Sequence, residues 1–71
     1  MEGLTEGRIV HYSLGVGEHR AAIVTDVIDK NAGVVSLVVF WLQYDSPMDT
    51  NYVSYNEHTD YYGSWHWIEK A

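Results

Sequence analysis

Short apolar stretches alternate with turn-forming residues along the whole chain. Four turn signals separate segments that each have the length of a strand: Gly15-Val16-Gly17, Asp29 to Gly33, Asp45-Ser46-Pro47 and Asn56 to Asp60. The segments between them are rich in β-branched and aromatic residues, and none combines helix periodicity with capping residues. The pattern predicts five strands, which cover residues 8–14, 21–28, 34–42, 51–56 and 64–68.

The longest apolar run, residues 34–42, contains a single polar residue, Ser36. The loop before it, Asp29 to Gly33, has the length and the final glycine of a hairpin loop, which predicts antiparallel pairing of the second and third strands. A strand that is apolar on both faces needs a cover on each, and a 71-residue chain has few residues left for a second layer. We therefore expect a second copy of the chain to supply the cover, so that the protein is a homo-oligomer.

Five short strands in a chain of this length predict one all-β domain that covers residues 1–71. A small five-stranded antiparallel SH3-like barrel fits best, because closure of the sheet removes exposed strand edges. An OB-like barrel has the same number of strands and is the alternative. The few residues between the third and fourth strands leave little room for the helix that such a barrel carries there.

The composition excludes several classes of function. Lys and Arg number 4 against 10 Asp and Glu, and this balance argues against a DNA or RNA coat role, which needs a surplus of cations. The absence of cysteine excludes disulfides and thiolate metal sites. No stretch approaches the roughly 20 apolar residues of a membrane span, and residues 1–8 lack the apolar run of a signal peptide, so we expect no membrane association and a cytoplasmic protein.

Cationic side chains are concentrated in the first 20 residues. Arg8, His11, His19 and Arg20 all lie there, whereas residues 41–62 contain four acidic residues and neither Lys nor Arg. This segregation predicts a local positive site for a phosphate or carboxylate, because Arg offers a planar fork of donors. The alternative is that both arginines only pair with neighbouring glutamates at the surface, where ion pairs contribute little.

The Trp65-His66-Trp67 motif places two indoles on one face of a strand and His66 on the other. Paired indoles can stack on a flat base, but a tryptophan in the last strand of a small barrel more often fills the core or contacts another subunit. The cationic residues and this motif together give the candidate ligand-binding set: Arg8, His11, Tyr12, His19, Arg20, Trp65, His66 and Trp67.

The sequence predicts neither a metal site nor catalysis. Metal binding by His58 and Asp60, with His66 as a third ligand, would require these side chains to converge, and no repeated ligand spacing supports it. No serine stands in a nucleophile-elbow pattern. We therefore expect no cofactor and a non-enzymatic protein.

Five tyrosines characterise the acidic second half of the chain. They provide stiff contact surface for a peptide or protein partner, or they stabilise short strands by cross-strand packing. Both interpretations stay open for this set: Tyr44, Tyr52, Tyr55, Tyr61 and Tyr62.

Three segments resemble a group of small phage and prophage proteins: MEGLTEGRIVHY at residues 1–12, EHRAAIV at 18–24 and GSWHW at 63–67. Many members of that group have Pro where this chain has Ala21. They also carry a Gly- and Asp-rich insertion after the third strand, which here is only Gln43 to Asn51. The resemblance covers both ends of the chain and brings no assigned catalytic residues.

The resemblance implies a host-takeover or counter-defence role, for which one solution is a small oligomer that sequesters a nucleotide signal. Because one small barrel cannot enclose such a ligand, the pocket is expected at a subunit interface. The alternative is a protein-interaction module, either an inhibitor of a host protein or a minor virion component, that uses the tyrosine-rich loops. An enzyme that cleaves the ligand is the least favoured hypothesis.

Overall fold

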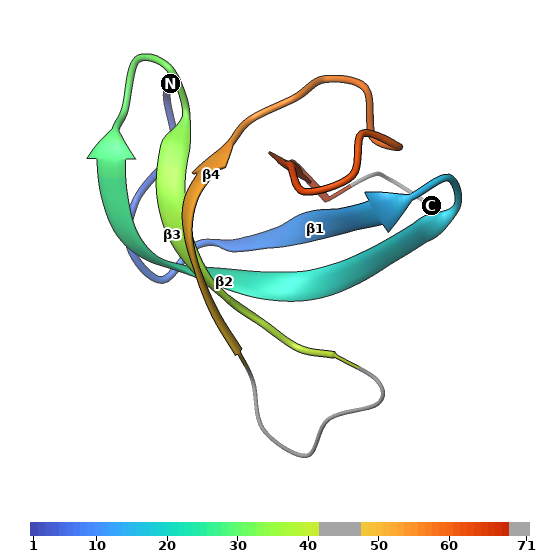
Figure 1. Ribbon diagram of the computed structural model, residues 1–71. Coiled ribbons are helices and arrows are strands. Elements are labelled where there is room, and N and C mark those ends of the chain that lie inside the picture. Colours follow the sequence, from blue (N-terminus) through green and yellow to red (C-terminus); the bar gives the residue numbers. More distant parts are fainter. Residues whose placement is uncertain (42–47, 69–71) are drawn as a thin grey trace.

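A computed structural model describes residues 1–41 and 48–68 as a single five-stranded antiparallel sheet (Figure 1). The strands follow the spatial order β4-β3-β2-β1-β5, and the described residues contain no helix. Among these residues there is accordingly no helix that could cross a membrane. The strand bounds are β1 Ile9–Gly15, β2 Glu18–Asp29, β3 Val34–Val39, β4 Met48–Ser54 and β5 Trp65–His66.

All five predicted strands are present, and the all-β prediction is confirmed. β2 begins three residues earlier than predicted because Glu18 already pairs with Gly15 across the turn. β4 begins at Met48 because that residue pairs with Val39 at the end of β3. β3 and β5 are shorter than predicted. Leu42, Tyr44 and the turn predicted at Asp45-Ser46-Pro47 lie outside the described residues.

The hairpin between β2 and β3 forms as its loop sequence predicts. One carboxylate oxygen of Asp29 accepts hydrogen bonds from the backbone N–H groups of Asn31 and Ala32, both at 3.1 Å. Gly33 closes the loop with a φ of +74°, a conformation that glycine adopts without strain. The two strands then pair antiparallel from Asp29 and Val34 to Ala22 and Val39.

Extra residues in β2 and β4 bend the sheet. β2 has one unmatched residue between Val24 and Asp26 and another between Val27 and Asp29, relative to β3. In β4 two residues stand opposite Ser36, and one of them, Tyr52, has a φ of +57°. Such bulges increase the local twist and turn a strand away from its neighbour. The chain after β4 consequently passes over the sheet and returns beside β1 (Figure 1).

The sheet is not closed into a barrel, so the closure predicted from the sequence is wrong. β4 and β5 are its two edges, and among the described residues a parallel bridge between Tyr55 and Trp65 connects the chain just after β4 to β5. A hydrogen bond from Asn56 N–H to the Trp65 carbonyl at 3.1 Å accompanies it, whereas Tyr55 N–H donates to the Gly33 carbonyl, in the β2–β3 loop, at 3.0 Å. A two-residue β5 offers too little backbone for a full ladder with β4.

The core lies on the concave side of the bent sheet. β3 alternates between the two sides: Val35, Leu37 and Val39 are buried, whereas Val34 and Val38 are half-exposed. The outer face of β3 is therefore incompletely covered within the chain, and self-association stays a prediction. The buried apolar side chains are Leu4, Val10, Tyr12, Ala22, Val24, Val35, Leu37, Val39, Val53 and Trp65.

Trp65 packs in the core and contacts the β2–β3 loop and the residues that follow β4 and β5. Its side chain is fully buried, and its indole N–H donates to the Gly33 carbonyl at 2.7 Å. Its ring contacts Tyr55 and Trp67 edge to face, at centroid separations of 5.1 and 5.0 Å. Of the two interpretations of this tryptophan, the core-filling one is confirmed. Because the Trp65 ring is buried within the chain, its contact with Trp67 is made from the core side.

Candidate functional site

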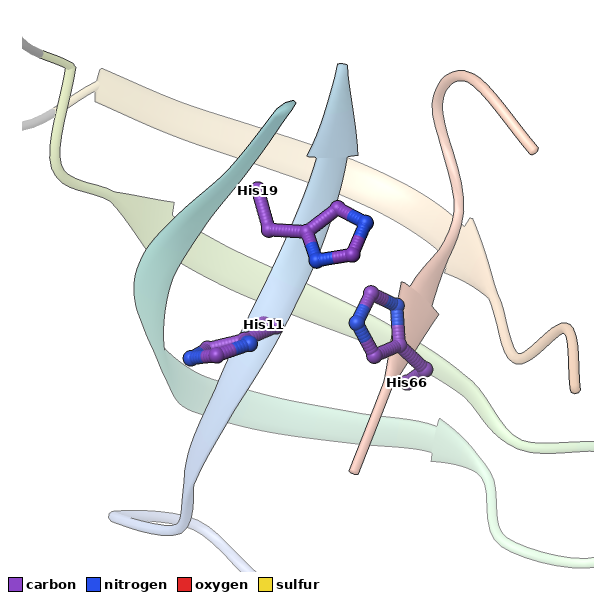
Figure 2. Close-up of side chains that lie close together, drawn as sticks. All are labelled: His11, His19 and His66. Carbon is purple, nitrogen blue, oxygen red and sulfur yellow. The ribbon is translucent and has the colours of Figure 1, made fainter. Parts of the chain in front are cut away.

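Three of the four histidines of the chain converge on one face of the sheet, from three adjacent strands (Figure 2). His11 on β1 stands directly opposite His66 on β5. His19 on β2 stands opposite Ser13, two residues along β1 from His11. Residues two apart on a strand share a face, and diagonal neighbours are within reach of long side chains. The strand register therefore brings the three imidazoles together.

The three rings touch one another closely. Their centroids lie 4.5 Å apart for His19 and His66, 5.6 Å for His11 and His66, and 6.0 Å for His11 and His19. One ring nitrogen from each residue lies within 4.8 Å of the other two. His66 is buried, whereas His11 and His19 are half-buried, so the cluster borders solvent on one side.

This geometry fits a small metal ion. Metal–nitrogen distances of about 2.0–2.1 Å in a tetrahedral site place ligand nitrogens about 3.3 Å apart. The nitrogens of the cluster reach that spacing if each moves by about 1 Å toward a common centre. Small rotations about the side-chain torsions allow a movement of this size. Neutral imidazole is the ligand that Zn²⁺, Cu²⁺ and Ni²⁺ share, so the donor set selects transition metals over Ca²⁺ or Mg²⁺.

An aspartate lies beside His19, one member of this cluster. Asp60, in the segment between β4 and β5, has a carboxylate oxygen 3.5 Å from Nε2 of His19. The same oxygen accepts a hydrogen bond of 3.0 Å from the backbone N–H of Gly17, in the turn between β1 and β2. Asp60 thus connects the segment before β5 to the hairpin that carries His11 and His19.

Three other predicted site residues lie on the opposite face of the same strands. Tyr12 pairs with Arg20 on one side and with Trp65 on the other. Arg20 donates from Nη1 to the His19 carbonyl at 3.0 Å. Burial raises the pKa of the Tyr12 phenol above its usual value, and the nearby Tyr62 phenol raises it further. These residues do not face the imidazoles.

The last two predicted residues form a separate surface feature. The guanidinium carbon of Arg8 lies 5.3 Å from the ring centroid of Trp67, within the range of a cation–π contact. These two side chains border a shallow hollow together with Gly7, Ile9 and Ile68. The single site predicted from eight residues is therefore divided into the histidine cluster, a group on the core face and the Arg8–Trp67 hollow.

The tyrosine-rich half also forms a surface. Tyr52, Tyr61 and Tyr62 are exposed, and a second hollow is lined by residues that include Tyr52, Tyr55 and Tyr61. This arrangement is compatible with the predicted protein-interaction surface, which stays a prediction.

The histidines that converge are not the set that the sequence pattern suggested for a metal site. That set was His58 and Asp60 with His66, whereas the structure joins His66 to His11 and His19. One signal was available: a hairpin centred on Gly15-Val16-Gly17 puts His11 and His19 on one face of two paired strands. The pairing of β5 with β1 has no comparable local signal.

The chain matches no known protein family model, and no curated protein or solved structure matches it.

Proposed function

We propose that the protein binds a divalent transition metal ion, Zn²⁺ foremost, through His11, His19 and His66. The observation that carries the proposal is the convergence of one nitrogen from each imidazole to within 4.8 Å of the others. Three histidines are an established ligand set for Zn²⁺, and they leave further coordination positions for other groups. No sulfur ligand is needed, which suits a chain without cysteine.

The position of the ligands in the fold adds a structural role. β5 consists of two residues, and its antiparallel pairing is with β1, through His11–His66 and Tyr12–Trp65. An ion bound to His11, His19 and His66 would join β1, β2 and β5 at one point. Because the ligands come together only in the folded chain, metal binding would stabilise the folded state.

Calorimetric titration with Zn²⁺ tests the proposal. The wild type should bind one ion per chain, and His11→Gln and His19→Gln should weaken binding strongly, because each removes one of three ligands. Both positions are half-buried, so glutamine is accommodated more readily there than at the buried His66. His58→Gln is the matched control, since His58 is exposed and lies outside the cluster. Equal binding by His58→Gln and His19→Gln would contradict the proposal.

A second candidate function is retention of a small anionic ligand with a flat ring, such as a nucleotide signal. The Arg8–Trp67 hollow favours it, because it combines a cation, a half-buried indole and apolar side chains. Under this second candidate function the protein is a non-enzymatic binding module. The resemblance to phage proteins implies such a module. Self-association and a counter-defence role are further predictions.

Calorimetry against cyclic oligonucleotides and adenosine-diphosphate-ribose derivatives tests this candidate. Arg8→Ala should abolish the heat of binding, whereas Lys30→Ala, which removes an equal charge from the loop between β2 and β3, should retain it. Heat that is unchanged in Arg8→Ala, or no heat with any compound, would contradict the candidate without affecting the metal site.

A further inference from the structure

Asp60 lies beside His19, one of the three residues of the proposed metal centre. We infer that Asp60 orients His19 as an outer-sphere carboxylate and that the fourth position of the bound ion is left for a small exogenous ligand, water or an inorganic anion. This inference rests on the proposed metal-binding function. Its basis is the 3.5 Å contact between Asp60 Oδ1 and Nε2 of His19.

The two nitrogens of His19 have different surroundings. Nε2 is the nitrogen beside Asp60. In Figure 2, Nδ1, the ring nitrogen next to the carbon that bears the side-chain stem, lies on the side of His11 and His66, whereas Nε2 points away from His11. His19 would therefore bind the ion through Nδ1 and donate its Nε2 proton to Asp60. A metal-bound histidine typically donates its second N–H to a carboxylate or carbonyl, which fixes the tautomer and makes the ring a better ligand.

The carboxylate of Asp60 is held away from the metal position. Its Oδ1 atom accepts the hydrogen bond from Gly17 N–H at 3.0 Å, and its contact with His19 is at Nε2, the ring nitrogen that points away from His11 in Figure 2. The groups that converge within 4.8 Å are the three imidazoles. Among the described residues, Asp60 is thus a positioning residue and not the fourth ligand.

Three nitrogen ligands leave a tetrahedral ion one open position. Sites of this type hold water or a small anion there, whereas structural zinc sites use four protein ligands. The partial exposure of His11 and His19 gives that position a route to solvent. The ligand class follows from the chemistry of the ion, which as a Lewis acid attracts compact anionic donors such as azide or hydroxide.

Co²⁺ provides a direct test, because its visible absorption reports coordination number and ligand exchange. Co²⁺ titration of the wild type should give the intense bands of a four-coordinate ion, and added azide should shift them. Asp60→Asn keeps an oxygen that can accept from Gly17 N–H but removes the negative charge beside His19. It should weaken Co²⁺ affinity about 10–100-fold, with the shape of the spectrum unchanged. Glu57→Gln is the matched control, since it removes an equal charge from the same segment, and its affinity should equal that of the wild type.

The outcomes separate this inference from the proposed function. If Asp60→Asn binds Co²⁺ as tightly as the wild type, Asp60 is not a positioning residue. If it loses binding as completely as His19→Gln, or acquires a different spectrum, the carboxylate is a direct ligand and the inference is wrong. A wild-type spectrum that azide does not change overturns the open position. In each of these cases the wild type still binds Co²⁺, whereas failure of the wild type to bind either Co²⁺ or Zn²⁺ overturns the proposed function itself. Thermal unfolding of each variant without metal confirms that the fold is retained.

Discussion

Replacement of Gly33 by alanine should destabilise the fold far more than the same replacement at other turn glycines. Gly33 has a φ of +74°, and a Cβ atom added there would lie 2.7 Å from Cβ of Tyr55 and 3.1 Å from the side chain of Met1. The Gly33 carbonyl also accepts hydrogen bonds from Tyr55 N–H at 3.0 Å and from the Trp65 indole at 2.7 Å. The new methyl group therefore enters the junction between the β2–β3 loop and the chain that leads from β4 to β5.

The magnitude has two parts. An L-residue in the left-handed region costs about 1–2 kcal/mol relative to glycine. Relief of the 2.7 Å contact requires Tyr55 to move by about 1 Å, which weakens two hydrogen bonds that contribute about 1 kcal/mol each. The sum is about 3–4 kcal/mol. A domain of this size has a free energy of unfolding of roughly 4–10 kcal/mol, so Gly33→Ala should lose about a third or more of it.

Gly7→Ala separates the two parts. Gly7 has a φ of +86°, and nothing lies within 4 Å of a Cβ atom placed there, so only the backbone cost of about 1–2 kcal/mol applies. Urea unfolding followed by tryptophan fluorescence measures both variants. With a slope of about 1 kcal/mol per molar urea, the midpoint of Gly33→Ala should lie about 2 M below that of Gly7→Ala. Midpoints within about 0.5 M of each other would refute the proposed close contact with Tyr55.

Three further predictions concern the core, a turn and the metal. Trp65→Phe should lower the free energy of unfolding by about 2 kcal/mol, because it loses the hydrogen bond to the Gly33 carbonyl and part of the buried ring volume. Trp67→Phe should lower it by less. Urea unfolding measures both variants. Asp29→Ala should cost about 1 kcal/mol, or about 4–8 °C in Tm, because Asn31 and Ala32 lose their acceptor, whereas Asp29→Asn should retain most of the stability. Zn²⁺ at about 100 times its Kd should add about 2.7 kcal/mol, or about 10–20 °C in Tm, to the wild type and to His58→Gln. A Tm of His19→Gln that rose equally would contradict binding at the cluster.

The strands were predictable because their signals are local. The glycine at position 33 and the acceptor at Asp29 specify the β2–β3 hairpin within a few residues of sequence, and the structure has the predicted loop. Closure was not predictable, because it depends on the length of β5 and on the bulge at Tyr52, and a left-handed tyrosine has no sequence signal of its own. The run at residues 34–39 shows a similar limit: valines that are half-exposed cannot be distinguished from buried ones by hydropathy alone.

The site was predictable only in part for the same reason. The sequence brought His11, His19 and His66 into one candidate set, but on the argument that cations and aromatics would gather around an anion. Their mutual approach depends on the register of β1 against β5, which pairs His11 with His66. The same register puts Tyr12 and Trp65 on the core side, so within one chain the candidate set is divided between the two faces of the sheet. Alternation along each strand predicts this division once the register is known.

The pairing of β1 with β5 also fixes when the histidine cluster can exist during synthesis. The hairpin that carries His11 and His19 leaves the ribosome before His66, which follows the four other strands of the described sheet in the sequence. Contacts between such distant positions form late, because a long loop must close before they can contribute. A nascent chain therefore presents at most two of the three imidazoles, and tight capture of an ion would occur only once translation has delivered the last strand.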